Sequence, residues 1–246
     1  MEKEQKAVSR KKKAPSHLTV IALLLVVCGA VVLLYPLYTN WLYNKDVQVQ
    51  VDAFRGQMEK QPEALPFEDL YQELTRRNEQ LYLEKQRNLT DPFSYERPNI
   101  DLSAYGLEGN VIGFISIPKM DIELPILLGA NNENMRLGAV HLTETSYPIG
   151  GVNTNCVIAA HRGYSKAAMF RDIEALEIGD EIYIENFRET LVYRVVELRV
   201  IHPTDINQLL IQEGRDLVTL ITCHPYRHNY QRYVVFCERA ESEPEA

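Results

Sequence analysis

Several signals of common protein classes are absent from this 246-residue chain. It contains no internal repeat, and its six histidines and four cysteines do not have the spacing of a zinc site. Acidic residues outnumber basic ones by 34 to 26, so the formal net charge at pH 7 is −8. A negative surface disfavours nucleic acid as a main partner. The sequence therefore gives no reason to expect a metal, another cofactor or bound nucleic acid.

A second absence is local. Residues 18–38 form a run of 21 residues without a charged side chain. A helix needs about 20 such residues to cross the apolar core of a bilayer. A cleaved signal peptide has a shorter apolar region, of roughly 7 to 15 residues, and a small-residue cleavage site, which is not evident here. Cys28 also follows the bulky Val27 rather than the small residue of a lipoprotein signal. We therefore predict an uncleaved transmembrane helix over residues 18–38.

The charges around this segment predict its orientation. Residues 1–17 contain six basic and two acidic side chains. Basic residues favour the cytoplasmic side of a membrane segment, so residues 1–17 are expected in the cytoplasm. The rest of the chain is then extracellular, and the protein is a single-pass protein of the cell membrane. Trp41 and Tyr43 stand where an aromatic belt at the membrane surface is expected.

The extracellular part divides into a helical region and a region of short strands. In the first, Phe67, Leu70, Leu74 and Leu81 fall on one face of a predicted helix that begins near Pro66. From about residue 110, short apolar runs alternate with glycine or proline, which predicts a closed β-barrel or a sandwich. The seven expected strands are residues 111–117, 120–127, 156–160, 181–185, 191–201, 217–222 and 233–237. Short helices are expected at residues 167–176 and 205–213.

The strongest functional signal is a cysteine at the end of one of these strands. Cys223 closes an apolar run, Arg232 follows nine residues later, and a second apolar run ends in His161. A thiol with an ordinary pKa near 8.5 is mostly protonated at neutral pH, so a nucleophilic cysteine needs a base or a positive neighbour. We therefore interpret Cys223 as a nucleophile, His161 as an acid and base, and Arg232 as a donor to the substrate or an oxyanion.

Other residues compete for these roles. His141 is the rival of His161, although its apolar neighbours favour a buried structural histidine. Arg162 and Arg227 compete with Arg232, but neither begins a strand-like run. Cys156 and Cys237 lie in apolar runs, which favours buried free thiols. A disulfide bond between these two cysteines remains the alternative.

Three segments carry a resemblance to sortases, the cysteine transpeptidases of Gram-positive bacterial surfaces. Residues 219–223 read TLITC and match the TLxTC signature of that family. Residues 160–163 read AHRG and resemble its histidine segment, and Arg232 stands at the distance of its arginine. The resemblance implies a mainly β fold, a closed eight-stranded barrel with short helices, over residues 99–238. A helical stalk and lid at residues 39–98 would precede the barrel, and an acidic tail at residues 239–246 would follow it.

Within that family, the chain is most similar to class C, the pilus-polymerising type. Asp91, Pro92 and Phe93 resemble the lid of this class, in which the aspartate approaches the cysteine and the ring covers the cleft. An ordinary helix-ending turn is the alternative for these residues. TCHPY at residues 222–226 is close to the TCTPY of class C, and GAVHL at residues 138–142 is close to its GAGHL. RHNYQ at residues 227–231 departs from the usual NTH-like segment, and the polar residues 239–246 stand where class C commonly has a second membrane segment.

The resemblance implies a reaction and its partners. The expected substrate is a surface protein or pilin with an LPxTG-like sorting signal, cleaved after threonine through a thioacyl intermediate. The acceptor would be an amine, and the class C resemblance implies a pilin lysine in pilus assembly. A sortase that uses an amine of the cell-wall precursor is one alternative. An inactive anchored module that binds such peptides is the other.

Overall fold

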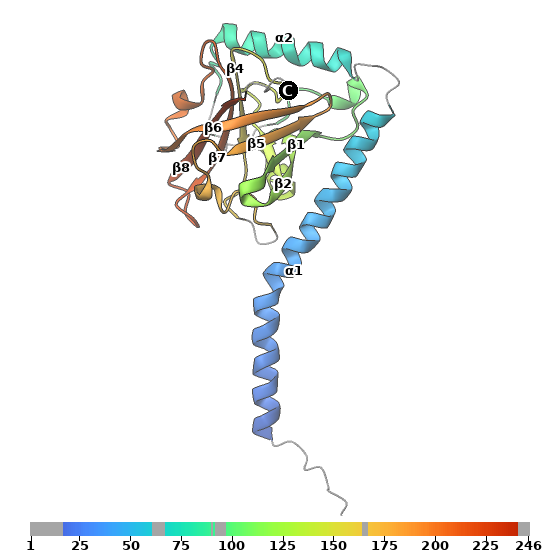
Figure 1. Ribbon diagram of the computed structural model, residues 1–246, viewed down its shortest axis with the longest axis vertical. Helices are drawn as coiled ribbons and strands as arrows, with labels where there is room; N and C mark the ends of the chain where they lie inside the picture. The colour runs from blue at the N-terminus through green and yellow to red at the C-terminus, as the bar shows by residue number, and fades with distance from the viewer. Residues whose placement is uncertain (1–16, 61–66, 90, 92–96, 164–166, 241–246) are drawn as a thin grey trace, which may run out of the picture.

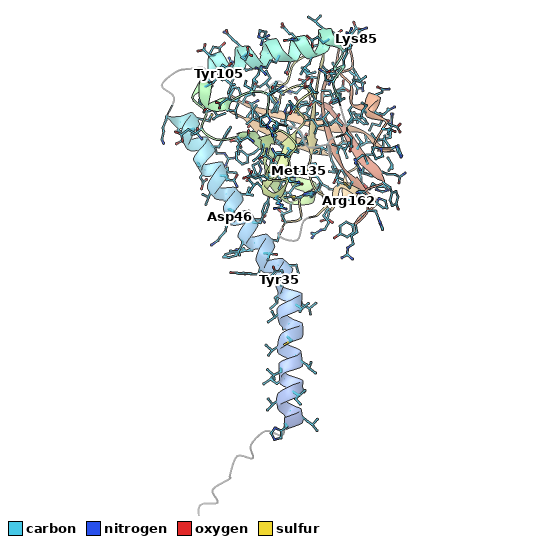
Figure 2. The ribbon with its side chains drawn as sticks, turned by 180° about the vertical axis from the view of Figure 1, so that it is seen from behind. Tyr35, Asp46, Lys85, Tyr105, Met135 and Arg162 are labelled. Atoms are coloured by element: carbon cyan, nitrogen blue, oxygen red, sulfur yellow. The ribbon has the colours of Figure 1, made fainter. Side chains whose placement is uncertain are left out.

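The computed structural model describes residues 17–60, 67–89, 91, 97–163 and 167–240. A compact barrel stands at one end of the long helix α1 (His17–Glu59), and the first half of this helix projects away from it (Figure 1). The helix bends near Tyr35, one residue before Pro36 (Figure 2). A proline within a helix removes a backbone hydrogen bond and kinks the axis.

The two halves of α1 have different surroundings. Among the described residues it is the one helix long and apolar enough to cross a membrane, and its apolar stretch has a mean hydropathy of 2.9 and is fully exposed. In the second half, Val47, Val51 and Phe54 are buried, and they pack against the barrel. The second half of α1 is therefore part of the folded domain.

Eight strands form the barrel. They are β1 (Val111–Ile117), β2 (Ile122–Leu128), β3 (Ala139–His141), β4 (Thr154–Ala159), β5 (Glu181–Asn186), β6 (Thr190–Ile201), β7 (Asp216–His224) and β8 (Gln231–Arg239). The sheet closes in the order β1-β2-β3-β4-β7-β8-β6-β5, which confirms the predicted closed barrel and excludes a sandwich. All seven runs expected from the sequence form strands, with ends that differ by at most two residues. The missed strand, β3, is three residues long and too short to show a period-2 pattern.

The short helices differ more from expectation. The two predicted helices are reduced to single turns, η3 (Ile173–Ala175) and η4 (Ile206–Leu209), because the surrounding residues lie in turns and extended backbone. Three further short helices were not predicted: η1 (Leu102–Tyr105), η2 (Pro118–Met120) and α3 (Asn134–Leu137).

Strand β4 explains how the barrel positions its functional end. Its six residues are all buried, because Cys156 and Ile158 face one apolar core while Val157 and Ala159 face a second. It pairs in parallel with β7, from Thr154 beside Asp216 to Ala159 beside Ile221. Parallel neighbours run in the same direction, so β4 and β7 end at the same rim of the barrel.

Helix α2 (Glu68–Glu84) covers the opposite end of the barrel (Figure 1). Of the four residues of the predicted apolar face, Phe67, Leu70 and Leu74 are buried, whereas Leu81 is half-buried. The helix ends in the left-handed conformation of Lys85, whose backbone N–H donates to the carbonyl of Tyr82.

Cys156 and Cys237 are buried free thiols. Each is the register partner of Val218, on opposite sides of β7. Two strand spacings separate their backbones by roughly 9 to 10 Å. A disulfide needs Cα atoms within about 7 Å, so this geometry excludes the bond that the sequence left open.

Candidate active site

Cys223 and Arg232 are direct partners across two antiparallel strands. The register of β7 and β8 pairs them, so their side chains emerge on the same face. The Nη1 atom of Arg232 lies 4.0 Å from Sγ of Cys223. The same nitrogen donates to the backbone carbonyls of Asn229 at 2.8 Å and Gln231 at 3.0 Å. The buried guanidinium of Arg232 is therefore fixed beside the half-buried sulfur.

His161 reaches the same rim from β4. The parallel pairing continues past Ala159, because the N–H of Ala160 donates to the carbonyl of Ile221 at 3.3 Å. The hydroxyl of Thr222 also donates to the carbonyl of Ala160, at 2.7 Å. One residue further along both strands, this register brings His161 to the level of Cys223. The structure thus brings the three predicted catalytic residues to one rim of the barrel.

The backbone on both sides of His161 is fixed by hydrogen bonds. Before it, the carbonyl oxygen of Ala160 is the acceptor of the Thr222 hydroxyl. After it, the N–H groups of Gly163 and Phe170 donate to the carbonyl of His161 at 2.9 and 3.0 Å. Gly163 has a φ of 83°, in the left-handed region that favours glycine, and it turns the chain away from the barrel rim.

The surroundings of Cys223 and His161 favour the neutral thiol and the neutral imidazole. Burial raises the pKa of the Cys223 thiol, the guanidinium of Arg232 lowers it, the carboxylate of Asp91 raises it, and Arg162 lowers it. Burial also lowers the pKa of His161, and the positive charge of Arg136 lowers it further. A raised thiol pKa and a lowered imidazole pKa both disfavour the thiolate–imidazolium pair. In this state the cysteine is therefore mostly an unreactive thiol at neutral pH.

Asp91 binds the catalytic arginine candidate through both of its oxygens. Nε of Arg232 donates to Oδ1 at 3.0 Å, and Nη2 donates to Oδ2 at 2.8 Å, across 141 residues of chain. The turn that ends α2 is formed at Lys85, so the alternative of Asp91 as an ordinary helix-ending residue does not apply. The other two predicted lid residues, Pro92 and Phe93, lie outside the described residues.

A second polar cluster lies on the other side of the cysteine, and the sequence interpretation missed it. Arg162 forms an ion pair with Glu174, with 2.7 Å between Nη2 and Oε2, and its Nη1 lies 2.8 Å from Nδ1 of His224. The same Nδ1 is 3.1 Å from the carboxylate of Glu174. Tyr233 lies beside both the guanidinium and the imidazole, with ring-centre distances of 5.9 and 5.7 Å. The sequence did contain one indication of this cluster: His224 stands where the TCTPY motif has threonine.

The rival residues have other surroundings. His141 is 1% exposed, and its Nε2 lies 3.2 and 3.1 Å from the carbonyls of Thr145 and Ser146. Burial lowers the pKa of His141 to about 4, so it stays neutral as a structural histidine. Arg227 is exposed and lies over the ring of Tyr226 at 5.4 Å. The contacts of His141 and Arg227 therefore do not support a catalytic role for either residue.

This arrangement is suited to acyl transfer. A cysteine, a fixed guanidinium and a histidine on a hydrogen-bonded loop supply a nucleophile, an oxyanion donor and a proton carrier. Within the described ranges, no group of three or more histidine, cysteine, aspartate or glutamate side chains could hold a metal ion. Together, the thiol, the imidazole and the guanidinium can perform covalent catalysis with proton transfer.

Comparison with known proteins agrees with this chemistry. The family model of the sortase domain matches residues 115–240. The crystal structure of Streptococcus agalactiae sortase C1 in complex with MTSET is 30% identical, has a TM-score of 0.71, and is matched over 79% of this chain and 100% of that one. Sortase C of Streptococcus pneumoniae is also 30% identical, with a TM-score of 0.63 over 78% of this chain and 96% of that one. Sortase A of Bacillus anthracis is 29% identical over 217 residues, which are 88% of this chain and 91% of that protein.

Proposed function

Because the chain belongs to the sortase family, we propose that it is a membrane-anchored cysteine transpeptidase. Its proposed substrate carries an LPxTG-like sorting signal, which it cleaves after threonine before transferring the acyl group to an amine. The observation that carries this proposal is the direct pairing of Cys223 with Arg232 at the rim where β4 delivers His161. Like these neighbours, the chain has a closed barrel, and the class C structures match it over most of their length.

The proposed reaction has two steps. In the first, His161 takes the proton of Cys223, and the sulfur attacks the threonine carbonyl to form a tetrahedral intermediate. The guanidinium of Arg232, fixed beside the sulfur, donates to the oxyanion. The peptide C–N bond then breaks, and His161 returns the proton to the leaving amine, which leaves a thioester on Cys223.

In the second step an incoming amine attacks the thioester. His161 accepts a proton from that amine, a new amide bond forms, and the sulfur leaves as a thiolate that regains the proton. Both steps need a guanidinium with free donor positions. Arg232 is bound by Asp91 here, so we assign Asp91 to a lid that must leave before the substrate enters. Pro92 and Phe93 complete this proposed lid on the resemblance to class C.

A matched pair of cysteine variants tests the proposed nucleophile. The full chain is purified in detergent, incubated with an LPxTG peptide and analysed by mass spectrometry for a thioacyl adduct. Cys223→Ala is expected to abolish both the adduct and peptide turnover. Cys28→Ala changes an exposed cysteine of the apolar half of α1 and is expected to retain both. Turnover by the Cys223→Ala enzyme would sink the proposal.

The acceptor is proposed to be a lysine side chain of a pilin. This rests on the similarity to class C structures; one of them, from Streptococcus pneumoniae, is described in terms of pilin substrate specificity. Mass spectrometry with the sorting peptide and a lysine-bearing acceptor peptide is expected to show an isopeptide product. A gene deletion is expected to remove pilus ladders while leaving anchored monomers.

A second candidate acceptor is an amine of the cell-wall precursor, favoured by the similarity to sortase A of Bacillus anthracis over 88% of the chain. Loss of anchoring of surface proteins in the deletion strain, with no change in polymerisation, would favour it. The inactive peptide-binding module is distinguished by thiol labelling. Cys223 should remain unreactive in such a module even after Asp91 and Phe93 are both replaced by alanine.

We further propose that residues 18–38 cross the membrane with the barrel outside the cell. The exposed apolar half of α1 supports this, because nothing in the described part of the chain covers it. Protease treatment of intact wall-stripped cells is expected to digest the barrel and to leave residues 1–17 protected. An intact barrel after digestion that degrades a known surface protein would contradict the orientation.

A further inference from the structure

One face of the second half of α1 is docked along the barrel. Asn40, Tyr43, Val47, Val51 and Phe54 follow one another at spacings of three or four residues, so they form a single stripe. The last three are apolar and buried. The first two are polar, and each hydrogen-bonds to backbone far away in the sequence. The change from apolar to polar occurs where the stripe reaches the rim that holds the candidate active site.

Asn40 contacts the segment that follows His161. Its Oδ1 accepts a hydrogen bond from the N–H of Ala168 at 3.1 Å. Two residues later, the N–H of Phe170 donates to the carbonyl of His161 at 3.0 Å. Ala167, Met169 and Phe170 are buried, so this stretch is packed rather than exposed. The side chain of Asn40 is thus linked to the backbone of His161 through one short, packed segment.

Tyr43 contacts the other neighbour of His161. Its hydroxyl donates to the carbonyl of Leu137 at 2.8 Å. Leu137 is the last residue of α3, which also holds Arg136, the charge that acts on His161. Figure 2 shows Met135 of α3 and Arg162 at the end of the barrel nearer the free half of α1, with Lys85 at the far end. Asn40 and Tyr43 therefore hold two segments that act on His161, one through its backbone carbonyl and the other through the charge of Arg136.

We propose that Asn40 and Tyr43 are positioning residues for His161, so that the helix leaving the membrane fixes the acid–base group of the reaction. The inference rests on the proposed transpeptidase function. Apolar contacts have little directionality, whereas the hydrogen bonds of Asn40 and Tyr43 fix the end of the docked helix that lies near His161. A displacement of about 1 Å at a catalytic group can cost roughly 100-fold in rate.

The test compares four variants of the full chain in detergent or nanodiscs. Asn40→Ala and Tyr43→Phe each remove one of the two hydrogen bonds, and Asn40→Asp keeps an acceptor oxygen at the same place. Gln48→Ala is the control, because Gln48 lies on the same helix and hydrogen-bonds to Glu123 of β2 at 2.7 Å, away from His161. Steady-state kinetics with the sorting peptide and thermal unfolding are measured for each variant.

We expect kcat to fall by about 10- to 100-fold in Asn40→Ala and in Tyr43→Phe, with KM within about twofold of the parent. Asn40→Asp should recover most of kcat, and Gln48→Ala should match the parent. Unchanged kcat in both loss variants, a change confined to KM, or no recovery by Asn40→Asp would overturn the inference. If Asn40→Ala unfolds, Tyr43→Phe, which removes a single hydroxyl, decides the outcome. The parent is assayed first: an inactive parent sinks the proposed function, whereas an active parent with indifferent variants sinks only this inference.

Discussion

Two arginine–carboxylate pairs flank Cys223, and they differ in how the chain builds them. The side chains of Arg232 and Arg162 are both 6% exposed, and both lower the pKa of the thiol. Arg232 is bound by Asp91, from a segment that precedes the whole barrel. Arg162 is bound by Glu174, twelve residues away, and contacts His224 as well. In the proposed lid the first pair opens while the barrel stays intact, whereas the second pair joins two segments of the barrel domain.

The charged groups of the two pairs also act differently on the sulfur. Asp91 raises the pKa of Cys223 and so offsets part of the effect of Arg232, whereas Arg162 lowers that pKa. Asp91 therefore weakens the support that Arg232 gives to the thiolate, and the proposed opening of the lid would restore that support. Under the proposed function, the Asp91–Arg232 pair regulates the site, whereas the Glu174–Arg162 pair is part of its structure.

The largest difference is expected when each arginine is replaced by lysine. Arg232→Lys keeps the charge but loses the planar fork, and we expect kcat/KM for a sorting peptide to fall by about 100-fold or more. Arg162→Lys should cost less than about tenfold, because its proposed contribution is a charge rather than a donor geometry. Arg194→Lys, at an exposed pair with Glu181, is the control for general effects. Equal losses of kcat/KM in Arg232→Lys and Arg162→Lys would contradict the different roles assigned to the two arginines.

Neutralising the two carboxylates sharpens the comparison. Asp91→Asn removes a charge that raises the pKa of Cys223, so that pKa falls and the thiolate fraction at pH 7 rises. A decrease of one unit corresponds to roughly tenfold faster alkylation at pH 7. The rate of iodoacetamide labelling as a function of pH measures the shift, with Cys28 replaced by alanine. Glu174→Gln should leave the labelling profile in place, and an equal acceleration by both variants would contradict the assignment of the lid.

A smaller effect in the opposite direction is expected for the second guanidinium. Arg162→Gln removes a positive charge that lowers the pKa of Cys223, so that pKa rises and the thiolate fraction at pH 7 falls. We expect labelling to slow by about threefold, since the charge of Arg162 ranks behind those of Arg232 and Asp91. Arg162→Lys should restore the parental rate. Faster labelling in Arg162→Gln would show that its loss opens the site rather than changing its charge.

The smallest effect concerns stability. The side chain of Glu174 is 47% exposed, and ion pairs with such an exposed partner contribute roughly 0 to 1 kcal/mol. We therefore expect Glu174→Gln to lower the free energy of unfolding by no more than about 1 kcal/mol in urea titrations of the full chain. A larger loss would mean that the second pair holds the rim together, and its role would then be mainly structural.

Much of the barrel could be predicted because its strands carry local signals. Runs of β-branched and apolar residues bounded by glycine or proline located seven strands, since each run is long enough to show its pattern. Strand β3 has only three residues, and η3 and η4 are single turns, so tertiary contacts rather than local periodicity decide their conformation. The choice of a closed barrel over a sandwich and the number eight came from the family resemblance, and the order of the strands was not predicted.

The site was predictable to the extent that it lies at strand ends. Cys223, His161 and Arg232 each stand at or beside the end of an apolar run, and parallel pairing of β4 and β7 explains why two of them share a rim. Glu174 lies in a single-turn helix and carries no sequence signal of its own. Tyr43 was assigned to an aromatic belt, but its hydroxyl contacts Leu137 of the barrel domain. Contacts between segments that are distant in the sequence depend on the folded structure, so the spacing of residues in the sequence does not predict them.

The unbroken course of α1 from its apolar half into the barrel has a consequence for how substrates arrive. A helix rises 1.5 Å per residue, so Asn40 and Tyr43 stand roughly 3 and 8 Å beyond Tyr38, the last residue of the proposed membrane span. The catalytic rim would then stay at the height of the lipid headgroups. A substrate that is itself tethered to the bilayer needs only a short spacer before its cleavage motif, and the two proteins would meet by lateral diffusion in the plane of the membrane.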